Sequence, residues 1–99
     1  MDMKALMKQA EEMQEKVTKA QETLAKMSIK GIAGGGLAIV DLDGKYNLRK
    51  LSLSEDLMKE SLEDIAAIIS SAYTDAKTKV DANIDEVMGA ATSGMKLPE

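Results

Sequence analysis

The chain has 99 residues and a net charge of −4, with eight methionines, two tyrosines and no phenylalanine, tryptophan, histidine or cysteine. A domain of this size buries one modest core, and that core must be built from aliphatic and thioether side chains. The missing residue types exclude disulfides, thiolate metal sites and the commonest general base. The longest apolar runs, LAIV and IAAII, are too short to cross a membrane, so we expect a cytoplasmic protein.

The first predicted element is a helix over residues 1–27, which contain neither glycine nor proline. Its apolar residues recur at alternating intervals of three and four, the a/d pattern of a coiled coil. These residues are Met3, Leu6, Ala10, Met13, Val17, Ala20, Leu24 and Met27. So narrow a stripe on a helix roughly 40 Å long favours coiled-coil-like pairing with another helix over packing on the core of its own domain.

Residues 28–53 change to the period of β-strands. We predict three antiparallel strands at 28–33, 36–43 and 45–53, with Asp43–Gly44 as a hairpin turn. The apolar phase switches near Arg49 and Lys50, which indicates a bulge or a strand covered on both faces. A sheet that is apolar on both faces needs two covers, most simply helices and a second subunit. The candidate dimer-interface residues are Leu37, Ile39, Val40, Leu42 and Leu48.

The glycine-rich stretch GIAGGGLAIV, residues 31–40, raises the question of a phosphate-binding loop. Gly31 and Gly36 have the G-x-x-x-x-G spacing of such a loop. The loop should continue with Lys and then Ser or Thr into a helix, whereas Leu37 and Ala38 follow here and begin a strand. We therefore interpret the glycines as the tip of a hairpin.

Asp41 and Asp43 before Gly44 resemble the start of a calcium loop, but its further ligands are missing, and nucleophile elbows, H-E-x-x-H and paired cysteines are absent. We therefore expect no enzyme activity, small-molecule substrate, metal or cofactor.

A second helix is predicted over residues 61–91. Ser61 and Asp64 resemble a capping box at its start. Its first half is apolar on nearly every face and should be buried, whereas beyond Thr74 it becomes amphipathic and acidic and should project. Residues 92–99 are expected to form a flexible tail. Together the elements give a single α+β domain over residues 1–99.

The order of these elements and four stretches of sequence resemble one family. The stretches are LMKQAEEMQEKV (6–17), GIAGGGLAIVDLDGKYNLRKLSL (31–53), LEDIAAIISSAYTDAKTKV (62–80) and SGMKLP (93–98). The chain resembles the YbaB/EbfC family of small bacterial nucleoid-associated proteins. The resemblance implies a homodimer whose sheets meet at the centre and whose helices project as a tweezer-like pair. It also implies cytoplasmic, nucleoid-associated binding of double-stranded DNA with little sequence preference, serving chromosome organisation or gene regulation.

The charge distribution indicates where DNA would bind. Residues 1–27 are neutral overall, residues 28–54 carry +2 and residues 55–99 carry −6. Because the acidic part repels phosphate, the predicted DNA contacts lie in the first half of the chain. They are Lys4, Lys8, Arg49 and Lys50, with Lys16 and Lys19 as weaker candidates because each has a glutamate at i−4. Lys4 and Lys8 would also flank a helix N-terminus whose free N–H groups suit a phosphate.

A second hypothesis remains open at this point. Many of the lysines have a potential acidic partner on their own helix: Glu12–Lys16, Glu15–Lys19, Glu22–Lys26 and Asp75–Lys79. A salt-bridged, solvated helix surface would instead suit a dimeric scaffold or adaptor whose long helices dock protein partners. Salt distinguishes the two hypotheses, because phosphate binding weakens steeply with ionic strength.

Overall fold

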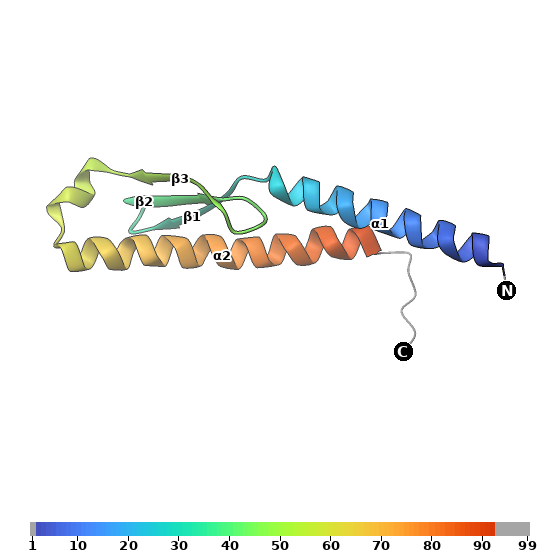
Figure 1. Cartoon of the computed structure of the whole chain (residues 1–99). Helices are drawn as coiled ribbons and strands as arrows, with labels where there is room; N and C mark the ends of the chain where they lie inside the picture. The colour runs from blue at the N-terminus through green and yellow to red at the C-terminus, as the bar shows by residue number, and fades with distance from the viewer. Residues whose placement is uncertain (1, 93–99) are drawn as a thin grey trace.

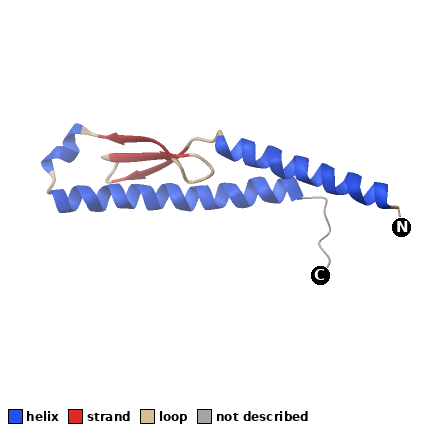
Figure 2. Cartoon of the chain, viewed as in Figure 1, coloured by secondary structure: helices blue, strands red, loops and turns tan. Residues whose placement is uncertain are grey.

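The computed structural model describes residues 2–92, which form two long helices and a three-stranded sheet (Figures 1 and 2). The elements are α1 (Met3–Ala25), β1 (Ile29–Ala33), β2 (Ala38–Leu42), β3 (Leu48–Leu53), the short 3-10 helix η1 (Glu55–Lys59) and α2 (Leu62–Thr92). The predicted α+β class and element order are confirmed. The molecule is elongated, with extents of 69 × 26 × 16 Å. The predicted tail lies outside the described residues, except that Thr92 still belongs to α2.

The core lies between α2 and one face of the sheet. The strands are antiparallel in the order β1-β2-β3, and α2 packs on β1 and β2. Alternate residues of β1 and β2 point toward α2, and alanines on α2 let the helix approach closely. The buried core residues are Ile29, Ala38, Val40, Leu42, Ala72, Ala76 and Val80. Two of the predicted dimer-interface residues, Val40 and Leu42, therefore lie in the core of the protomer, where they are 2% and 0% exposed.

α1 pairs with the same chain's α2 rather than standing alone. It lies alongside the C-terminal part of α2 and its N-terminus reaches past the end of that helix (Figure 1). Along this side of α1, Ala20 and Leu24 are buried, and Met13 and Val17 are half-buried. The second half of the apolar stripe of α1 thus lies along a helix of the same chain, as the expected helix–helix pairing requires. Met3, Leu6 and Met7 remain exposed.

The glycine-rich stretch is a turn, as predicted, with one glycine serving a different purpose. Gly34, Gly35 and Gly36 all have positive φ angles and connect β1 to β2. Gly31 instead lies within β1, where a Cβ would stand 2.1 Å from the Ala72 carbonyl oxygen and 2.3 Å from the Ala76 nitrogen. Its lack of a side chain lets β1 touch the backbone of α2.

The β2–β3 connection differs from the predicted Asp-Gly hairpin. The residue with positive φ is Tyr46, at 68°, whereas Gly44 is needed because a Cβ there would lie 2.6 Å from the Leu24 carbonyl oxygen. The Gly44 N–H donates to that same carbonyl at 2.7 Å, which joins the loop to the end of α1. The Asp43 carboxylate accepts the N–H groups of Lys45 and Asn47 at 2.7 and 3.0 Å. Burial raises the pKa of Asp43, but these hydrogen bonds outweigh burial and hold the pKa below its ordinary value.

The predicted bulge is confirmed in β3. Asp41 pairs with Lys50 and Leu42 pairs with Leu48, so Arg49 is the extra residue. The extra residue brings Leu48 back into the same alternation as Leu51 and Leu53. All three leucines therefore point to the face of the sheet on which α2 lies. α2 does not extend over this edge strand, and the three leucines are 58%, 41% and 50% exposed.

The first half of α2 is less buried than its composition suggested. Leu62 is 85% and Tyr73 is 41% exposed, whereas Ala72, Ala76 and Val80 in the middle of the helix are fully buried. The expectation that the first half is buried is therefore wrong for a single protomer. The capping prediction is confirmed, because Ser61 Oγ accepts the Asp64 N–H at 3.1 Å.

Candidate nucleic-acid interface

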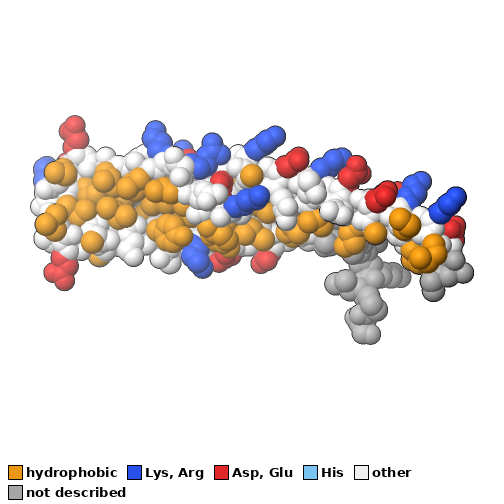
Figure 3. Space-filling model, in the orientation of Figure 1, with side chains coloured by type: hydrophobic (Ala, Val, Ile, Leu, Met, Phe, Trp, Pro, Cys, Tyr) orange, Lys and Arg blue, Asp and Glu red, His pale blue; other side chains and the backbone are white. Residues whose placement is uncertain are grey.

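The predicted DNA-contact residues fall into two groups in the structure. Lys4, Lys8, Lys16 and Lys19 lie along α1, and Arg49 and Lys50 lie on β3, with all six exposed. In Figure 3, blue basic side chains gather along the upper edge of the molecule over β3, whereas along α1 they alternate with red acidic ones. The structure therefore does not bring the six residues together into one cluster.

The N-terminus of α1 is not the open anion site that was expected. Asp2 is the N-cap, and its carboxylate accepts the Lys4 backbone N–H at 3.1 Å. A capping carboxylate supplies the negative charge that a helix N-terminus attracts, so a phosphate would have to compete with it. The side chains of Lys4 and Lys8, one helical turn apart on the same face of α1, remain exposed.

The lysines of α1 form fewer ion pairs than their spacing from glutamates predicted. Three of the expected ion pairs, Glu12–Lys16, Glu15–Lys19 and Glu22–Lys26, are not formed within residues 2–92. Asp75–Lys79 is confirmed at 3.0 Å. Lys16 and Lys19 are thus free of the partners that made them weaker candidates.

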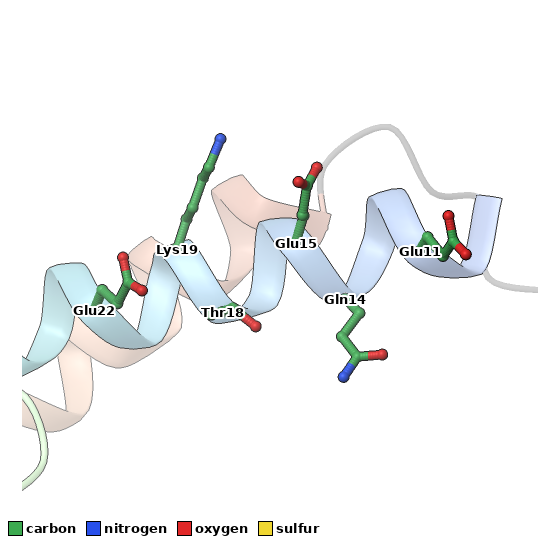
Figure 4. A pocket seen from close by; sticks show the side chains of 6 residues that line it. All are labelled: Glu11, Gln14, Glu15, Thr18, Lys19 and Glu22. Atoms are coloured by element: carbon green, nitrogen blue, oxygen red, sulfur yellow. The ribbon is translucent and has the colours of Figure 1, made fainter. Parts of the chain in front are cut away.

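A shallow groove along the middle of α1 includes one of these lysines. Its lining residues are Glu11, Gln14, Glu15, Thr18, Lys19 and Glu22, and Figure 4 shows that Lys19 and Glu15 point to the same side of the helix. Three carboxylates against one ammonium give the groove a negative charge. Such a groove repels phosphate, so the middle of α1 offers a duplex no continuous basic surface.

Arg49 already has partners inside the protomer. Its Nη1 donates to the carbonyl oxygens of Lys26 and Met27 at 3.1 and 2.9 Å. These carbonyls follow the last turn of α1, where a cation also meets the negative end of the helix dipole. The guanidinium therefore joins α1 to the sheet, and its Nη1 is already engaged with two carbonyl oxygens.

Lys50 lies on the face of the sheet opposite α2. The register places Lys30, Asp41 and Lys50 side by side across the three strands, out of phase with the buried residues. Lys30 contributes to the positive charge of residues 28–54 but was not among the predicted contacts. Only the strand register reveals that Lys30 and Lys50 belong to one row.

One acidic and one basic side chain of α2 form hydrogen bonds with the outer edge of β1. Asp75 Oδ2 accepts the Ile32 N–H at 2.9 Å, and Lys79 Nζ donates to the Lys30 carbonyl at 3.0 Å. The N–H of Ile32, and next the Lys79 side chain, hold the pKa of Asp75 below its usual value. Further along α2, Asp81 accepts the hydroxyl of Tyr46, which raises the pKa of that tyrosine. Through these contacts, side chains of α2 hold the outer edge of β1 and the β2–β3 loop.

The remaining predicted interface residues differ in accessibility. Leu37 and Ile39 are half-buried and Leu48 is exposed, in contrast to the buried Val40 and Leu42. Leu51 and Leu53, which were not predicted, share the exposed face with Leu48.

Within residues 2–92, no cluster of acidic side chains could hold a metal ion, and no helix is long and apolar enough to span a membrane.

Comparison with known proteins places this architecture in a family. The model of the YbaB/EbfC DNA-binding family matches residues 1–95. Nucleoid-associated proteins from three strains of Xanthomonas campestris pv. campestris (B100, 8004 and ATCC 33913) are each 44% identical over 95 residues, which covers 94% of this chain and 87% of theirs. A crystal structure of the uncharacterized protein HP0035 from Helicobacter pylori superposes with a TM-score of 0.79 at 21% identity. That match covers 91% of this chain and 96% of the other, and it shows the shared fold.

Proposed function

Because the chain belongs to the YbaB/EbfC DNA-binding family, we propose that it is a nucleoid-associated protein that binds double-stranded DNA through the phosphate backbone with little sequence preference. The 44% identity to proteins named as nucleoid-associated supports this function. Binding rather than catalysis also suits a chain without histidine or cysteine.

The available side chains suit phosphate contacts better than base reading. Exposed lysines occur along α1 and on the sheet, and contacts from lysine to phosphate carry no sequence information. No phenylalanine or tryptophan is available to stack on unpaired bases. We assign the candidate contacts to the exposed residues Lys4, Lys8, Lys16, Lys19 and Lys50, with a lesser part for Arg49, whose Nη1 already has two carbonyl partners.

The proposed function includes a homodimer, which the exposed leucines of β3 support. Leu48, Leu51 and Leu53 face the same side as the core of the protomer but lie beyond the reach of α2. In Figure 3 an orange apolar area occupies this side of the molecule near the start of α2. At about 25 cal/mol per Å² of buried apolar surface, an apolar area of this kind is costly to leave in water. A second copy offers an identical apolar area to cover it.

The two edges of the sheet differ in a way that also favours association through β3. The edge of β1 is blocked where Asp75 and Lys79 bind its N–H and C=O groups. β3 is the other edge and pairs only with β2 in the part of the chain described here. Unprotected edges readily pair with another strand. A two-fold dimer formed along β3 would cover the leucines and leave both α1 helices projecting.

A direct test is a fluorescence-anisotropy titration with two labelled duplexes of unrelated sequence. We expect both to bind with closely similar Kd values, and each unlabelled duplex to displace the other. Binding confined to one duplex would contradict backbone recognition, and no binding to either would contradict the function itself.

A further inference from the structure

The face of the sheet opposite α2 carries a row of basic side chains. Lys30 on β1 and Lys50 on β3 flank Asp41 on β2, since each is directly paired with it. Neighbouring strands lie about 4.8 Å apart, so the two lysine backbones are separated by roughly 10 Å. Both side chains are exposed, and no described element of the protomer packs over them.

The one acidic group in this row does not neutralise the lysines by direct pairing. Both carboxylate oxygens of Asp41 accept the Ser28 hydroxyl at 2.8 Å. The lysines that form ion pairs within residues 2–92 are Lys59, Lys77 and Lys79, all outside the sheet. The ammonium groups of Lys30 and Lys50 are therefore available to an anionic partner.

Further positive charge surrounds the row at the end of the sheet nearest α1. Lys26 and Lys45 are exposed there, and Arg49 binds the carbonyls of residues 26 and 27. Across residues 26–50 the chain has five basic and two acidic residues. The second acidic residue, Asp43, is 8% exposed and hydrogen-bonded within its loop.

From these observations we propose that the face of the sheet opposite α2, with Lys30 and Lys50 as phosphate contacts, is a DNA-binding surface in addition to α1. This inference rests on the proposed function and specifies where the duplex lies. The separation of the lysines is close to the groove widths of B-DNA, about 6 to 12 Å, so their flexible stems can reach phosphates on either side of a groove. The proposed dimer uses the β3 edge and the leucines on the face that packs against α2. The DNA-binding surface on the other face therefore stays accessible and is present twice in the dimer.

The variant Lys30→Gln/Lys50→Gln tests the surface against a matched control, Lys59→Gln/Lys77→Gln, which loses the same charge from η1 and α2. Anisotropy titrations of one labelled duplex over a range of salt concentrations give the slope of log K against log salt. We expect the sheet variant to bind more weakly and its slope to flatten by about 0.9 per lost contact, or about 1.8 per protomer. The control variant should keep the slope of the unaltered chain.

Cross-linking provides a second readout that leaves both lysines in place. The chain has no cysteine, so a photoactivatable group can be attached at a single Ser52→Cys, on the proposed surface, or at Ser70→Cys, exposed on α2. We expect cross-links to duplex DNA from position 52 and not from position 70. DNA binding by the unaltered chain without either effect at the sheet would overturn the inference and leave the proposed function standing. No binding by the unaltered chain would overturn both.

Discussion

At the scale of single residues, Gly31 shows how a missing side chain determines the packing of two elements. A Cβ at this position would lie within 3 Å of three backbone atoms of α2. Backbone atoms of a long helix cannot move aside as a flexible side chain can. The strand and the helix would have to separate, which would loosen the core between them.

We therefore predict that Gly31→Ala destabilises the protein by roughly 2 kcal/mol or more, in the range of overpacked cores. The matched control is Gly89→Ala in α2, where a Cβ meets no atom within 4 Å and alanine should stabilise the helix by up to about 1 kcal/mol. Urea unfolding followed by circular dichroism measures both variants. Equal stability of the two would contradict the close contact between β1 and α2.

Asp75 gives a prediction for pH dependence. Its pKa is lowered in the folded protein, first by the Ile32 N–H and then by Lys79. A group with a lowered pKa stabilises the folded state above its unfolded pKa, near 4, and loses this contribution as the pH falls through the folded value. The urea midpoint of the unaltered protein should therefore exceed that of Asp75→Asn at about pH 6, and the difference should shrink below about pH 4. A difference that stays constant over this range would show that the charge of Asp75 does not matter.

At the scale of elements, the proposed dimer places the contact between the two copies on β3. Its leucines are exposed in the protomer, so replacing one should not disturb the core. We predict that Leu51→Glu yields a folded monomer, because a charged group at an apolar interface is strongly unfavourable. Ile32→Glu is the control, since Ile32 is similarly exposed, 50% against 41%, but lies on the opposite face of the sheet.

Light scattering measures the mass of each protein, and circular dichroism checks that each is folded. We expect the unaltered chain and the Ile32 variant to have the mass of a dimer. A dimeric Leu51 variant would exclude β3 as the interface, and a monomeric unaltered chain at micromolar concentration would exclude the dimer.

Local patterns predicted the elements well. The alternation in the strands, the bulge at Arg49 and the Ser61 cap are properties of neighbouring residues and are confirmed. The heptad stripe of α1 is buried only in its second half. Gly44 shows the limit of such patterns. Asp-Gly usually indicates a two-residue hairpin, but here the glycine makes room for Leu24 of α1, a contact that local sequence does not contain.

The candidate site was harder to predict because it depends on tertiary pairing. Val40 and Leu42 have the same apolar character as Leu51 and Leu53, and only the position of α2 decides which pair is buried in the protomer. The Lys30–Lys50 row likewise depends on the register of two strand pairs. The net charge of residues 28–54 indicates a basic region but does not show which of its side chains share a face of the sheet.

At the scale of the whole molecule, α2 and the sheet differ in charge, whereas α1 carries equal numbers of basic and acidic residues. The acidic side chains of α2 hold the edge of the sheet and its β2–β3 loop, whereas the basic side chains of the sheet point away from that helix. A duplex approaching the molecule would be repelled by α2 and attracted by the opposite side. This arrangement suits a protein whose sheet contacts the DNA backbone.

If the chain binds double-stranded DNA through phosphate contacts, binding by the unaltered protein must depend steeply on salt. Anisotropy titrations at several salt concentrations, on two duplexes of unrelated sequence, give log K against log salt. We predict a straight line with a steep negative slope of about 0.9 per phosphate contact, equal for the two duplexes. Affinity that is independent of salt, or slopes that differ between the duplexes, would contradict backbone recognition.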